Sequence, residues 1–341
     1  MFKIGKENYH IVINFLGIKL KFKNTKKIFK DYQKTQLLLK RMQIPTIYLA
    51  NLSTKQKIWY LSDKFYKEVG YFPDFKNPKT FNEKINWMKF NYYNPQEEKI
   101  IDKYEFKNYI KNKLKKDYTV PLIDVYEDVN EINVDKLPQK FVIKSTISGG
   151  SSGVEIIKDK NKTDINKLKY KFNNLLQEWH SIYYYSFCRG YKNIKPRIII
   201  EEYIEQNNHQ LYDYKFFCFN GEIKIIEFIS NRKNGNFCAS FYDENWKKLN
   251  LYSSNHKTGK SAKPKNFEKM KEIAKILSND FPFIRVDMYN INGKIYIGEM
   301  TFTPLSGFMK FNPLVWDNKL GEYLKLEKIE PKFIKILNEF L

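Results

Sequence analysis

The chain has 341 residues, of which 42% are hydrophobic and 17% are aromatic, enough for one large or two medium folded domains. This composition excludes a disordered chain, and only three scattered cysteines (Cys188, Cys218 and Cys238) exclude a disulfide-stapled scaffold. The 60 basic and 38 acidic residues give a net charge of +22, which would attract an anionic partner.

The basic residues are mostly lysines, and the excess of positive over negative charge is concentrated at the front of the chain. They comprise 55 lysines and only five arginines, whereas proteins that read nucleic acids rely heavily on arginine. Lysine accompanies abundant Asn, Ile, Tyr and Phe, a mixture that an AT-rich coding bias also produces. Residues 1–117 carry +15 of the net charge. We therefore expect no nucleic acid partner.

Residues 1–45 form a basic N-terminal segment, with 11 Lys/Arg against two acids and with apolar side chains interleaved. Such a segment could make peripheral contact with an anionic membrane surface, or it could form an ordinary strand pair or helix with a solvated lysine face. The longest apolar run, residues 11–20, is too short to span a bilayer. With the scattered cysteines, this predicts a cytoplasmic protein, either free or at the inner face of the membrane.

Residues 46–139 are predicted to form an α-rich front lobe. Apolar residues recur at helical spacing through residues 58–69, and Thr80-Phe-Asn-Glu83 has the form of a capping box that opens a second helix. A third helix is predicted from Glu98 to Leu114.

From residue 140 onward the pattern changes to that of strands. Apolar strands are predicted at 141–144, 154–157 and 196–204, with a helix over 165–179. Two hairpins turn at Asn-Gly pairs, Asn220-Gly221 and Asn292-Gly293, with a helix over 267–277 between them. Hairpins separated by helices indicate an α+β fold with antiparallel sheets, in two domains at 140–210 and 211–341.

A glycine-rich segment connects the first two of these strands. Glycine lets backbone N–H groups approach phosphate oxygens closely, although a flexible hairpin connection has the same composition. Lys144 ends the preceding strand, where its ammonium could reach phosphates. The segment consists of Ser148, Gly149, Gly150, Ser151, Ser152 and Gly153.

Two pairs of charged residues lie at or in later strands. Glu201 and Glu202 could face solvent, or they could accept the amino group of adenine while the backbone of Tyr203 and Ile204 meets the edge of the ring. Asp213 and Lys215 share one face of a strand. They could form an exposed ion pair, or contact a ribose and a phosphate.

The last hairpin carries the most informative charges. Arg285 and Asp287 share a face of one strand, and Glu299 and Thr301 share a face of the other. One extra residue in the loop would pair Asp287 directly with Glu299. Two facing carboxylates repel unless a cation lies between them, so this register predicts Mg²⁺ held by oxygen ligands. The alternative is a pair of ordinary exposed strand acids.

Taken in order, these segments resemble the TupA-like ATP-grasp family, which is called after a protein of teichuronopeptide biosynthesis. The resemblance covers roughly residues 60–325 and rests on six ordered motifs. These are Asp102-Lys-Tyr-Glu-Phe-Lys107, Phe141-Val-Ile-Lys144 with the glycine-rich segment, Ile200-Glu-Glu-Tyr-Ile204, Asp213-Tyr-Lys-Phe-Phe217, Arg285-Val-Asp-Met-Tyr289 and Ile297-Gly-Glu-Met-Thr-Phe-Thr-Pro304.

The resemblance implies an ATP-grasp fold in which two subdomains hold ATP between antiparallel sheets. It implies phosphate contacts for Lys103, Lys144, Lys215 and residues 148–153, and an adenine site at Glu201, Tyr203 and Ile204. It also implies ribose binding by Asp213, Mg²⁺ binding by Asp287 and Glu299, and an Arg285 that faces the transferred phosphoryl group. Thr301 stands where many ATP-grasp enzymes have Asn, which leaves a second Mg²⁺ open.

The implied reaction is carboxylate activation by ATP to an acyl phosphate, from which an amine displaces phosphate to form an amide. The family occurs in capsular and cell-surface polysaccharide pathways, which implies a uronic acid or an amino acid as the carboxylate. Two alternatives stay open: a kinase that phosphorylates a sugar or amine at the same ATP site, and a non-enzymatic binder of polyanions.

Overall fold

The computed structural model describes residues 11–15, 18–22, 49, 52–149, 153–177, 183, 186–205, 211–230, 237–253, 257–259 and 263–330. The chain divides into two compact units, Met1–Lys64 and Phe65–Leu341. In the first unit, β1 (Ile11–Phe15) and β2 (Ile18–Phe22) pair as an antiparallel hairpin. This is a strand pair, one of the two forms predicted for the basic segment, and most of residues 1–48 lie outside the described residues.

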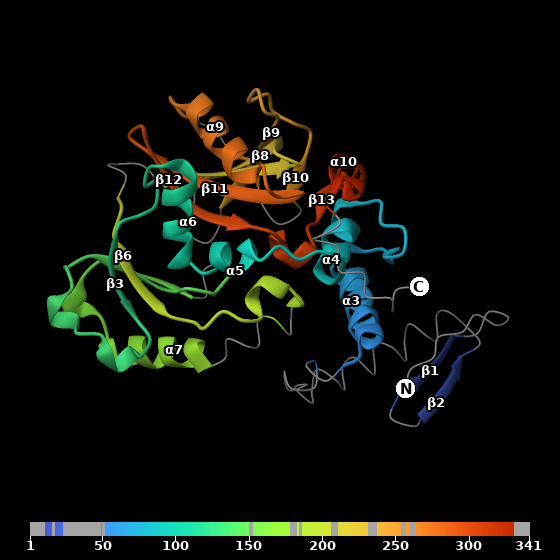
Figure 1. Cartoon of the computed structure of the whole chain (residues 1–341), viewed down its shortest axis with the longest axis horizontal. Coiled ribbons are helices and arrows are strands. Elements are labelled where there is room, and N and C mark those ends of the chain that lie inside the picture. The colour runs from blue at the N-terminus through green and yellow to red at the C-terminus, as the bar shows by residue number, and fades with distance from the viewer. Residues whose placement is uncertain are drawn as a thin grey trace. The chain divides into compact units, whose positions relative to one another are not determined.

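A four-stranded antiparallel sheet occupies one side of the second unit (Figure 1). Its order is β3 (Leu122–Tyr126), β6 (Ile198–Glu202), β4 (Phe141–Ser145) and β5 (Val154–Ile157). Helix α7 (Ile165–Gln177) packs on one face, where Phe172 meets Phe141 and Ile200 in a buried cluster. The opposite face therefore takes the polar residues of the same strands, because side chains alternate along a strand.

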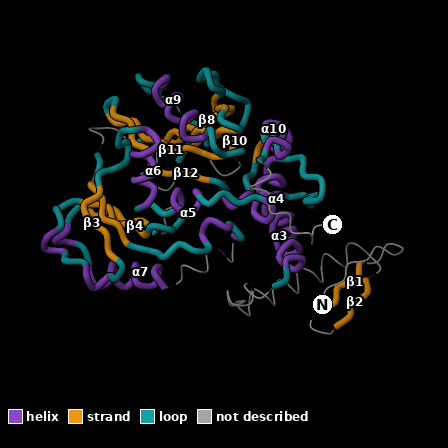
Figure 2. Tube along the Cα trace, in the orientation of Figure 1, coloured by secondary structure: helices purple, strands orange, loops and turns teal. Residues whose placement is uncertain are grey.

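A five-stranded antiparallel sheet forms the other half of this unit (Figure 2). Its order is β12 (Lys294–Thr301), β11 (Phe283–Ile291), β7 (Asp213–Phe219), β8 (Glu222–Ser230) and β9 (Cys238–Tyr242). One face packs on α6 (Glu105–Leu114) and α9 (Phe267–Ser278), and part of the other packs on α4 (Phe81–Asn91) and α10 (Val315–Tyr323).

Smaller elements complete the unit. Strands β10 (Tyr252–Ser253) and β13 (Phe311–Asn312) form a separate antiparallel pair, and α3 (Thr54–Val69) crosses the boundary between the units. The short 3₁₀ helices are Val129–Glu131, Val134–Lys136, Lys160–Lys162, Arg189–Tyr191, Pro304–Gly307 and Leu326–Lys328. The elements β3, β9, β10, β13 and α10 have no counterpart in the sequence-based prediction, which assigned the residues of β3 to the α-rich front lobe.

Helix α4 begins as the sequence predicts. The hydroxyl of Thr80 accepts a hydrogen bond from the backbone N–H of Glu83, and the Glu83 carboxylate accepts one from the backbone N–H of Thr80. This reciprocal pair satisfies two N–H groups that a helix start leaves without partners.

The predicted single helix from Glu98 to Leu114 is wrong, because the chain forms two helices, α5 (Gln96–Ile101) and α6. The Asp102 carboxylate accepts hydrogen bonds from the backbone N–H groups of Tyr104 and Glu105 and so starts a new helix. Lys103 therefore lies in the short connection between α5 and α6.

The α+β fold with antiparallel sheets is confirmed. Strand β3 lies before the predicted domain boundary at residue 140, yet it pairs with β6 of the four-stranded sheet. The division into four segments at residues 45, 139 and 210 stays a prediction.

Candidate functional site

One face of the five-stranded sheet changes from apolar to polar along its strands. Phe219 and Phe283 pair across β7 and β11 under α4 and α10. Two and four residues further along β11, on the same face, stand Arg285 and Asp287. Asp287 pairs with Lys215 of β7 on one side and with Glu299 of β12 on the other. The sheet thus places a row of charges beyond the edge of an apolar core.

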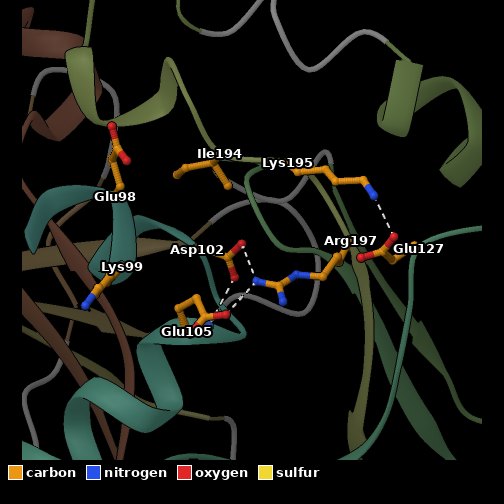
Figure 3. Close-up of a pocket in the computed structure, with 8 residues that line it drawn as sticks. All are labelled: Glu98, Lys99, Asp102, Glu105, Glu127, Ile194, Lys195 and Arg197. Atoms are coloured by element: carbon orange, nitrogen blue, oxygen red, sulfur yellow. Dashed lines mark hydrogen bonds and ion pairs between the residues drawn. The ribbon is translucent and has the colours of Figure 1, made fainter.

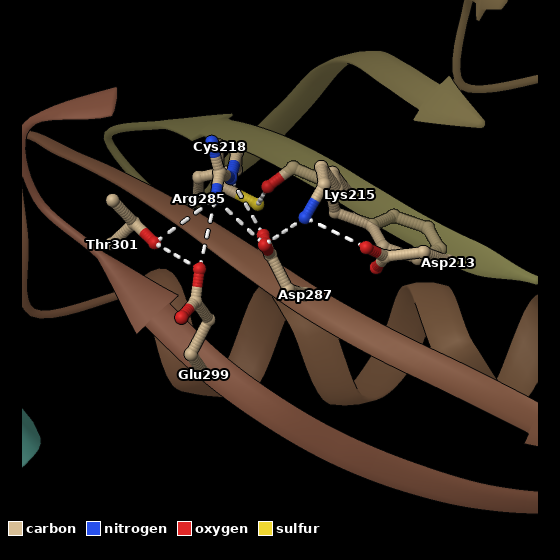
Figure 4. A network of polar contacts seen from close by, with 8 residues as sticks. Asp213, Lys215, Cys218, Arg285, Asp287, Glu299 and Thr301 are labelled. Carbon is tan, nitrogen blue, oxygen red and sulfur yellow. Dashed lines mark hydrogen bonds and ion pairs between the residues drawn. The ribbon is translucent and has the colours of Figure 1, made fainter. Parts of the chain in front are cut away.

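These side chains form one connected network (Figure 4). Arg285 donates from Nε to Asp287 Oδ1 at 2.6 Å and from Nη2 to Asp287 Oδ2 at 2.7 Å. Lys215 Nζ contacts Asp287 Oδ2 and lies 2.9 Å from Asp213 Oδ2. Arg285 Nη2 also donates to Glu299 Oε1 at 3.1 Å and to the hydroxyl of Thr301 at 3.2 Å. The network thus joins three predicted site carboxylates to the two predicted catalytic cations, which are Asp213, Asp287 and Glu299 and Lys215 and Arg285, respectively.

The predicted pairing of Asp287 with Glu299 is confirmed, but the extra residue is not in the loop. Asn292 and Gly293 form a two-residue turn, both with positive φ, and the register shifts further along at Gly298. A Cβ on Gly298 would lie 2.8 Å from the ring of Tyr289. The bulge therefore occurs at a position where a side chain would clash with this ring and glycine fits.

The electrostatics of the two facing acids differ. Burial raises the pKa of Asp287 to about 6, with the charges of Arg285 and Lys215 opposing this rise, so the carboxylate is ionised at neutral pH. For Glu299, burial favours the neutral form, but neighbouring cations outweigh it and lower its pKa to about 2. These cations are Lys215, Arg285 and Lys103.

The donor set fits Mg²⁺ that is shared with a ligand. Mg²⁺ is usually bound in proteins by one or two carboxylates together with waters and phosphate oxygens. Among the described residues no group of three or more His, Cys, Asp or Glu could hold a metal alone. Glu299 has 43% of its side chain exposed, whereas Asp287 is buried and both its oxygens contact cations. Glu299 is therefore the more accessible ligand of the two.

The four-stranded sheet also presents a charged face. Phe141 and Ile143 of β4 point into the core with α7, so Lys144 points to the other side. By the same alternation Glu201 lies on the side of Lys144, while the exposed Glu202 lies on the side of α7. Glu202, which the sequence predicts beside Glu201 at the adenine base or in solvent, thus points to the opposite side of the sheet from Glu201 and Lys144.

Lys103 lies at the break between α5 and α6 and reaches the glycine-rich segment. Its backbone N–H donates to the carbonyl of Thr146 at 2.9 Å, and its Nζ donates to the carbonyl of Ser148 at 2.6 Å. Burial lowers the pKa of Lys103, opposed by the charge of Glu299 and assisted by that of Lys144. Lys103 therefore connects the charged faces of the two sheets.

The glycine-rich segment is described at its two ends. Ser148 and Gly153 approach so closely that a Cβ on Gly153 would lie 2.1 Å from the Cβ of Ser148. The backbone N–H of Ser145 donates to the carbonyl of Gly153, which closes the base of the loop. The predicted site residues Gly150, Ser151 and Ser152 lie outside the described residues.

The segment after β6 contacts the other half of the site. Ile204 packs against Val120, Ile291 and Tyr296, the last two from the β11–β12 hairpin. The ring of Tyr203 lies 5.8 Å from the ammonium of Lys140. Residues 203 and 204 thus lie at a junction between the two sheets, where the sequence analysis predicts the adenine site.

Two charged residues of the site were not predicted, Lys107 and Asp102. Lys107 contacts Glu201 at 2.5 Å, and Asp102 contacts Arg197 at 3.0 Å. Both residues belong to the motif Asp102-Lys-Tyr-Glu-Phe-Lys107 on which the family resemblance rests, and this was the available signal. Asp102 lines a cavity of about 360 Å³ together with Glu98, Lys99, Glu105, Glu127, Ile194, Lys195 and Arg197 (Figure 3).

Two antiparallel sheets that face each other with lysines, an arginine and paired acids have the architecture of the ATP-grasp class. The model of one family, TupA-like ATPgrasp, matches residues 83–325. The chain belongs to this TupA-like ATP-grasp family. In a comparison with curated proteins, no match was found.

Solved structures that match this chain include ligases at low sequence identity. D-Alanine-D-Alanine ligase from Helicobacter pylori is 18% identical over 72% of this chain and 69% of its own, with a TM-score of 0.35. The ATP complex of the Bacillus anthracis D-alanine–D-alanine ligase is 19% identical over 60% of this chain and 53% of its own, with a TM-score of 0.35. The ADP complex of N5-carboxyaminoimidazole synthetase from Staphylococcus aureus is 14% identical over 70% and 54%, with a TM-score of 0.37.

Within the described residues, none of the helices has both the length and the apolar composition that a membrane crossing requires.

Proposed function

We propose that the protein is an ATP- and Mg²⁺-dependent carboxylate–amine ligase. The observation that carries the proposal is the charged row on β7, β11 and β12, in which Arg285 and Lys215 adjoin the facing acids Asp287 and Glu299. Membership of the ATP-grasp family supports ATP as the nucleotide. A uronic acid or amino acid as the carboxylate, and a role in cell-surface polysaccharide synthesis, remain part of this proposal.

The proposed chemistry needs positioning and charge neutralisation more than a protein nucleophile. Mg²⁺, when bound by Asp287 and Glu299, would neutralise charge on the phosphates. Lys103 and Lys144 would bind phosphate oxygens from the side of the four-stranded sheet. Arg285 would stabilise charge as the γ-phosphoryl group moves to the substrate carboxylate. The amine then attacks the acyl phosphate, and phosphate leaves.

In this arrangement Arg285 must exchange partners during the reaction. Its guanidinium forms ion pairs with Asp287 and Glu299 in the structure. Because an arginine donates through several N–H groups, it can keep one carboxylate contact while another N–H turns to a phosphoryl oxygen. A lysine at this position would not keep both contacts.

The first test is the dependence of ATP hydrolysis on both substrates. Incubation with ATP, Mg²⁺, glucuronate or an amino acid, and a panel of amines should release ADP and phosphate only when acid and amine are both present. Glu299→Gln serves as the control, since it keeps the shape but removes a metal-binding charge. Release of AMP, or no release with any pair of substrates, would contradict the proposal.

The mass of the product separates the ligase from a kinase with the same ATP site. An amide has the mass of acid plus amine less one water, whereas a kinase product carries a phosphoryl group. Peripheral membrane contact by residues 1–45 stays a prediction.

A further inference from the structure

The segment that precedes β6 contacts the end of β12, next to the row of charges. The Sγ atom of Cys188 lies 3.1 Å from the hydroxyl oxygen of Thr303. Thr303 follows two residues after Thr301, whose hydroxyl donates to Glu299 Oε1 at 3.2 Å. The 3₁₀ helix Arg189–Tyr191 begins directly after Cys188. The contact therefore places this short helix beside the end of the strand that carries Glu299.

The same 3₁₀ helix packs tightly on α5. A Cβ on Gly190 would lie 2.4 Å from Cδ1 of Ile101 and 3.1 Å from Cβ of Glu97, so glycine allows this approach without displacing either side chain. The guanidinium of Arg189 lies over the ring of Tyr93, 5.6 Å from its centre. Contacts with both α5 and β12 thus hold the 3₁₀ helix in a defined position.

Tyr191 ends the 3₁₀ helix, and its hydroxyl forms no hydrogen bond within the described part of the chain. The side chain is partly exposed and its oxygen is not fully buried, so a ligand can reach it. Burial raises the pKa of Tyr191, and the charges of Cys188 and Glu299 raise it further. The hydroxyl therefore keeps its proton at neutral pH and can donate a hydrogen bond.

Both sheets place Tyr191 at the end of the site opposite the predicted adenine position. In the four-stranded sheet, Tyr191 precedes the start of β6, whereas Tyr203 and Ile204 follow the end of this strand. In the five-stranded sheet, Ile204 packs near the turn between β11 and β12, whereas Thr303 lies beyond the other end of β12. The γ-phosphate is the end of ATP furthest from the base. ATP with its base at residues 203 and 204 would therefore extend its γ-phosphate toward Tyr191.

We propose that Tyr191 is a substrate-binding residue whose hydroxyl donates a hydrogen bond to the carboxylate of the acid substrate, and that Cys188 positions it through Thr303. This inference rests on the proposed function. The acid receives the γ-phosphoryl group, so its carboxylate must meet the γ-phosphate at this end of the site. A carboxylate oxygen accepts from a phenol hydroxyl, whereas the amine must keep its lone pair for the attack on the acyl phosphate.

The test separates binding of the acid from binding of the nucleotide. Tyr191→Phe removes only the hydroxyl, and the assay uses the acid and amine that release ADP fastest from the wild type. We expect the KM of the acid to rise about 10-fold or more, the loss of one hydrogen bond to a charged group. The KM of ATP and the ADP affinity from titration calorimetry should stay as in the wild type.

Tyr109→Phe is the matched control. Its hydroxyl is also enclosed and without a partner in the described structure, but it packs against the core of the five-stranded sheet. This substitution should change none of the kinetic values. Urea denaturation of both variants shows that each is folded.

Two substitutions at Cys188 test its positioning role. Cys188→Ala removes the contact with Thr303 and should raise the KM of the acid, whereas Cys188→Ser keeps a hydrogen-bonding group and should restore part of the loss. Combined with Tyr191→Phe, Cys188→Ala should raise this KM no further, because both act through one hydroxyl. An unchanged KM of the acid in Cys188→Ala would overturn the role of Cys188.

The remaining outcomes are distinct. An unchanged KM of the acid in folded Tyr191→Phe, or an equal rise in the KM of ATP, would overturn the inference and leave the proposed function standing. A wild-type protein that releases ADP with no pair of acid and amine would overturn both.

Discussion

Asp287 and Glu299 face each other across two strands, but they are held in different ways. Asp287 is buried and contacts both Arg285 and Lys215, which are themselves mostly buried. Glu299 is partly exposed and shares only one N–H group of Arg285. The two acids should therefore differ in what they contribute to stability, although both are proposed to bind the metal.

Asp287→Asn should destabilise the protein, because Arg285 and Lys215 each lose one of their two carboxylate partners in a buried place. We expect a loss of about 3 kcal/mol in the free energy of unfolding. Glu299→Gln should cost less than about 1 kcal/mol, since its contact is partly exposed. Both variants should lose ligase activity.

Urea denaturation and ADP release, measured on the same preparations, check this difference. Equal destabilisation by the two substitutions would show that the deeper burial of Asp287 does not make its ion pairs more important for stability than those of Glu299.

Glu97 is a buried acid outside the charged network. It lies in the first turn of α5, and burial raises its pKa from 4.5 to about 8, opposed by a backbone hydrogen bond at Asn94 and the charge of Arg189. A carboxyl with a raised pKa keeps its proton in the folded state after the unfolded chain has lost it. Stability from this group is therefore present below pH 4.5 and is lost as the pH rises toward 8.

Glu97→Gln should remove this pH dependence. Glutamine resembles the protonated acid, so the variant should gain stability over the wild type as the pH rises, by up to about 1.4 kcal/mol per pH unit in this window. Urea denaturation at pH 5 and pH 8 measures it. A constant difference between the two proteins at both pH values would contradict the assignment.

At the scale of elements, the ends of the glycine-rich segment differ in the space around their glycines. A Cβ on Gly153 would meet Ser148 at 2.1 Å, whereas a Cβ on Gly149 would have no heavy atom within 4 Å. Close packing therefore requires glycine at position 153 but not at position 149. Comparing Gly153→Ala with Gly149→Ala therefore separates the effect of a steric clash from the effect of adding a methyl group to this segment.

Gly153→Ala should force Ser148 and its carbonyl away from Lys103, at a cost of about 1–3 kcal/mol. We expect ADP affinity to fall about 10-fold or more. Gly149→Ala, whose Cβ would meet no described heavy atom within 4 Å, should lose less ADP affinity than Gly153→Ala. Calorimetric titration of both variants with ADP gives the comparison, and an equal loss in both would mean that the contact with Ser148 is unimportant.

The element boundaries show where sequence patterns suffice and where they fail. The capping box at Thr80 and the Asn-Gly turn at Asn292 depend on neighbouring residues, and both were predicted correctly. The break at Asp102 was missed because the apolar spacing continues from Ile101 to Ile110 across it. The bulge at Gly298 was assigned to the loop, although a glycine within a strand is its usual signal.

For the whole molecule, the sequence predicted the fold class and the pairing of neighbouring strands, but not the order of distant ones. Strands β3 and β6 pair although more than 70 residues separate Leu122 from Glu201. Nothing local specifies such a partner. Lys107 and Glu201 lie even further apart in the chain, which explains why their contact was missed.

Helix α6 is held to the two sheets by different forces. Phe106 and Ile110 belong to the apolar core of the five-stranded sheet, while Lys107 reaches Glu201 of the four-stranded sheet through an ion pair. Apolar burial persists at high salt, but ionic contacts weaken unless they stay dry. The pair between Lys107 and Glu201 is itself mostly buried, so α6 ties the two sheets together, and any change in the spacing of the sheets would have to break this pair.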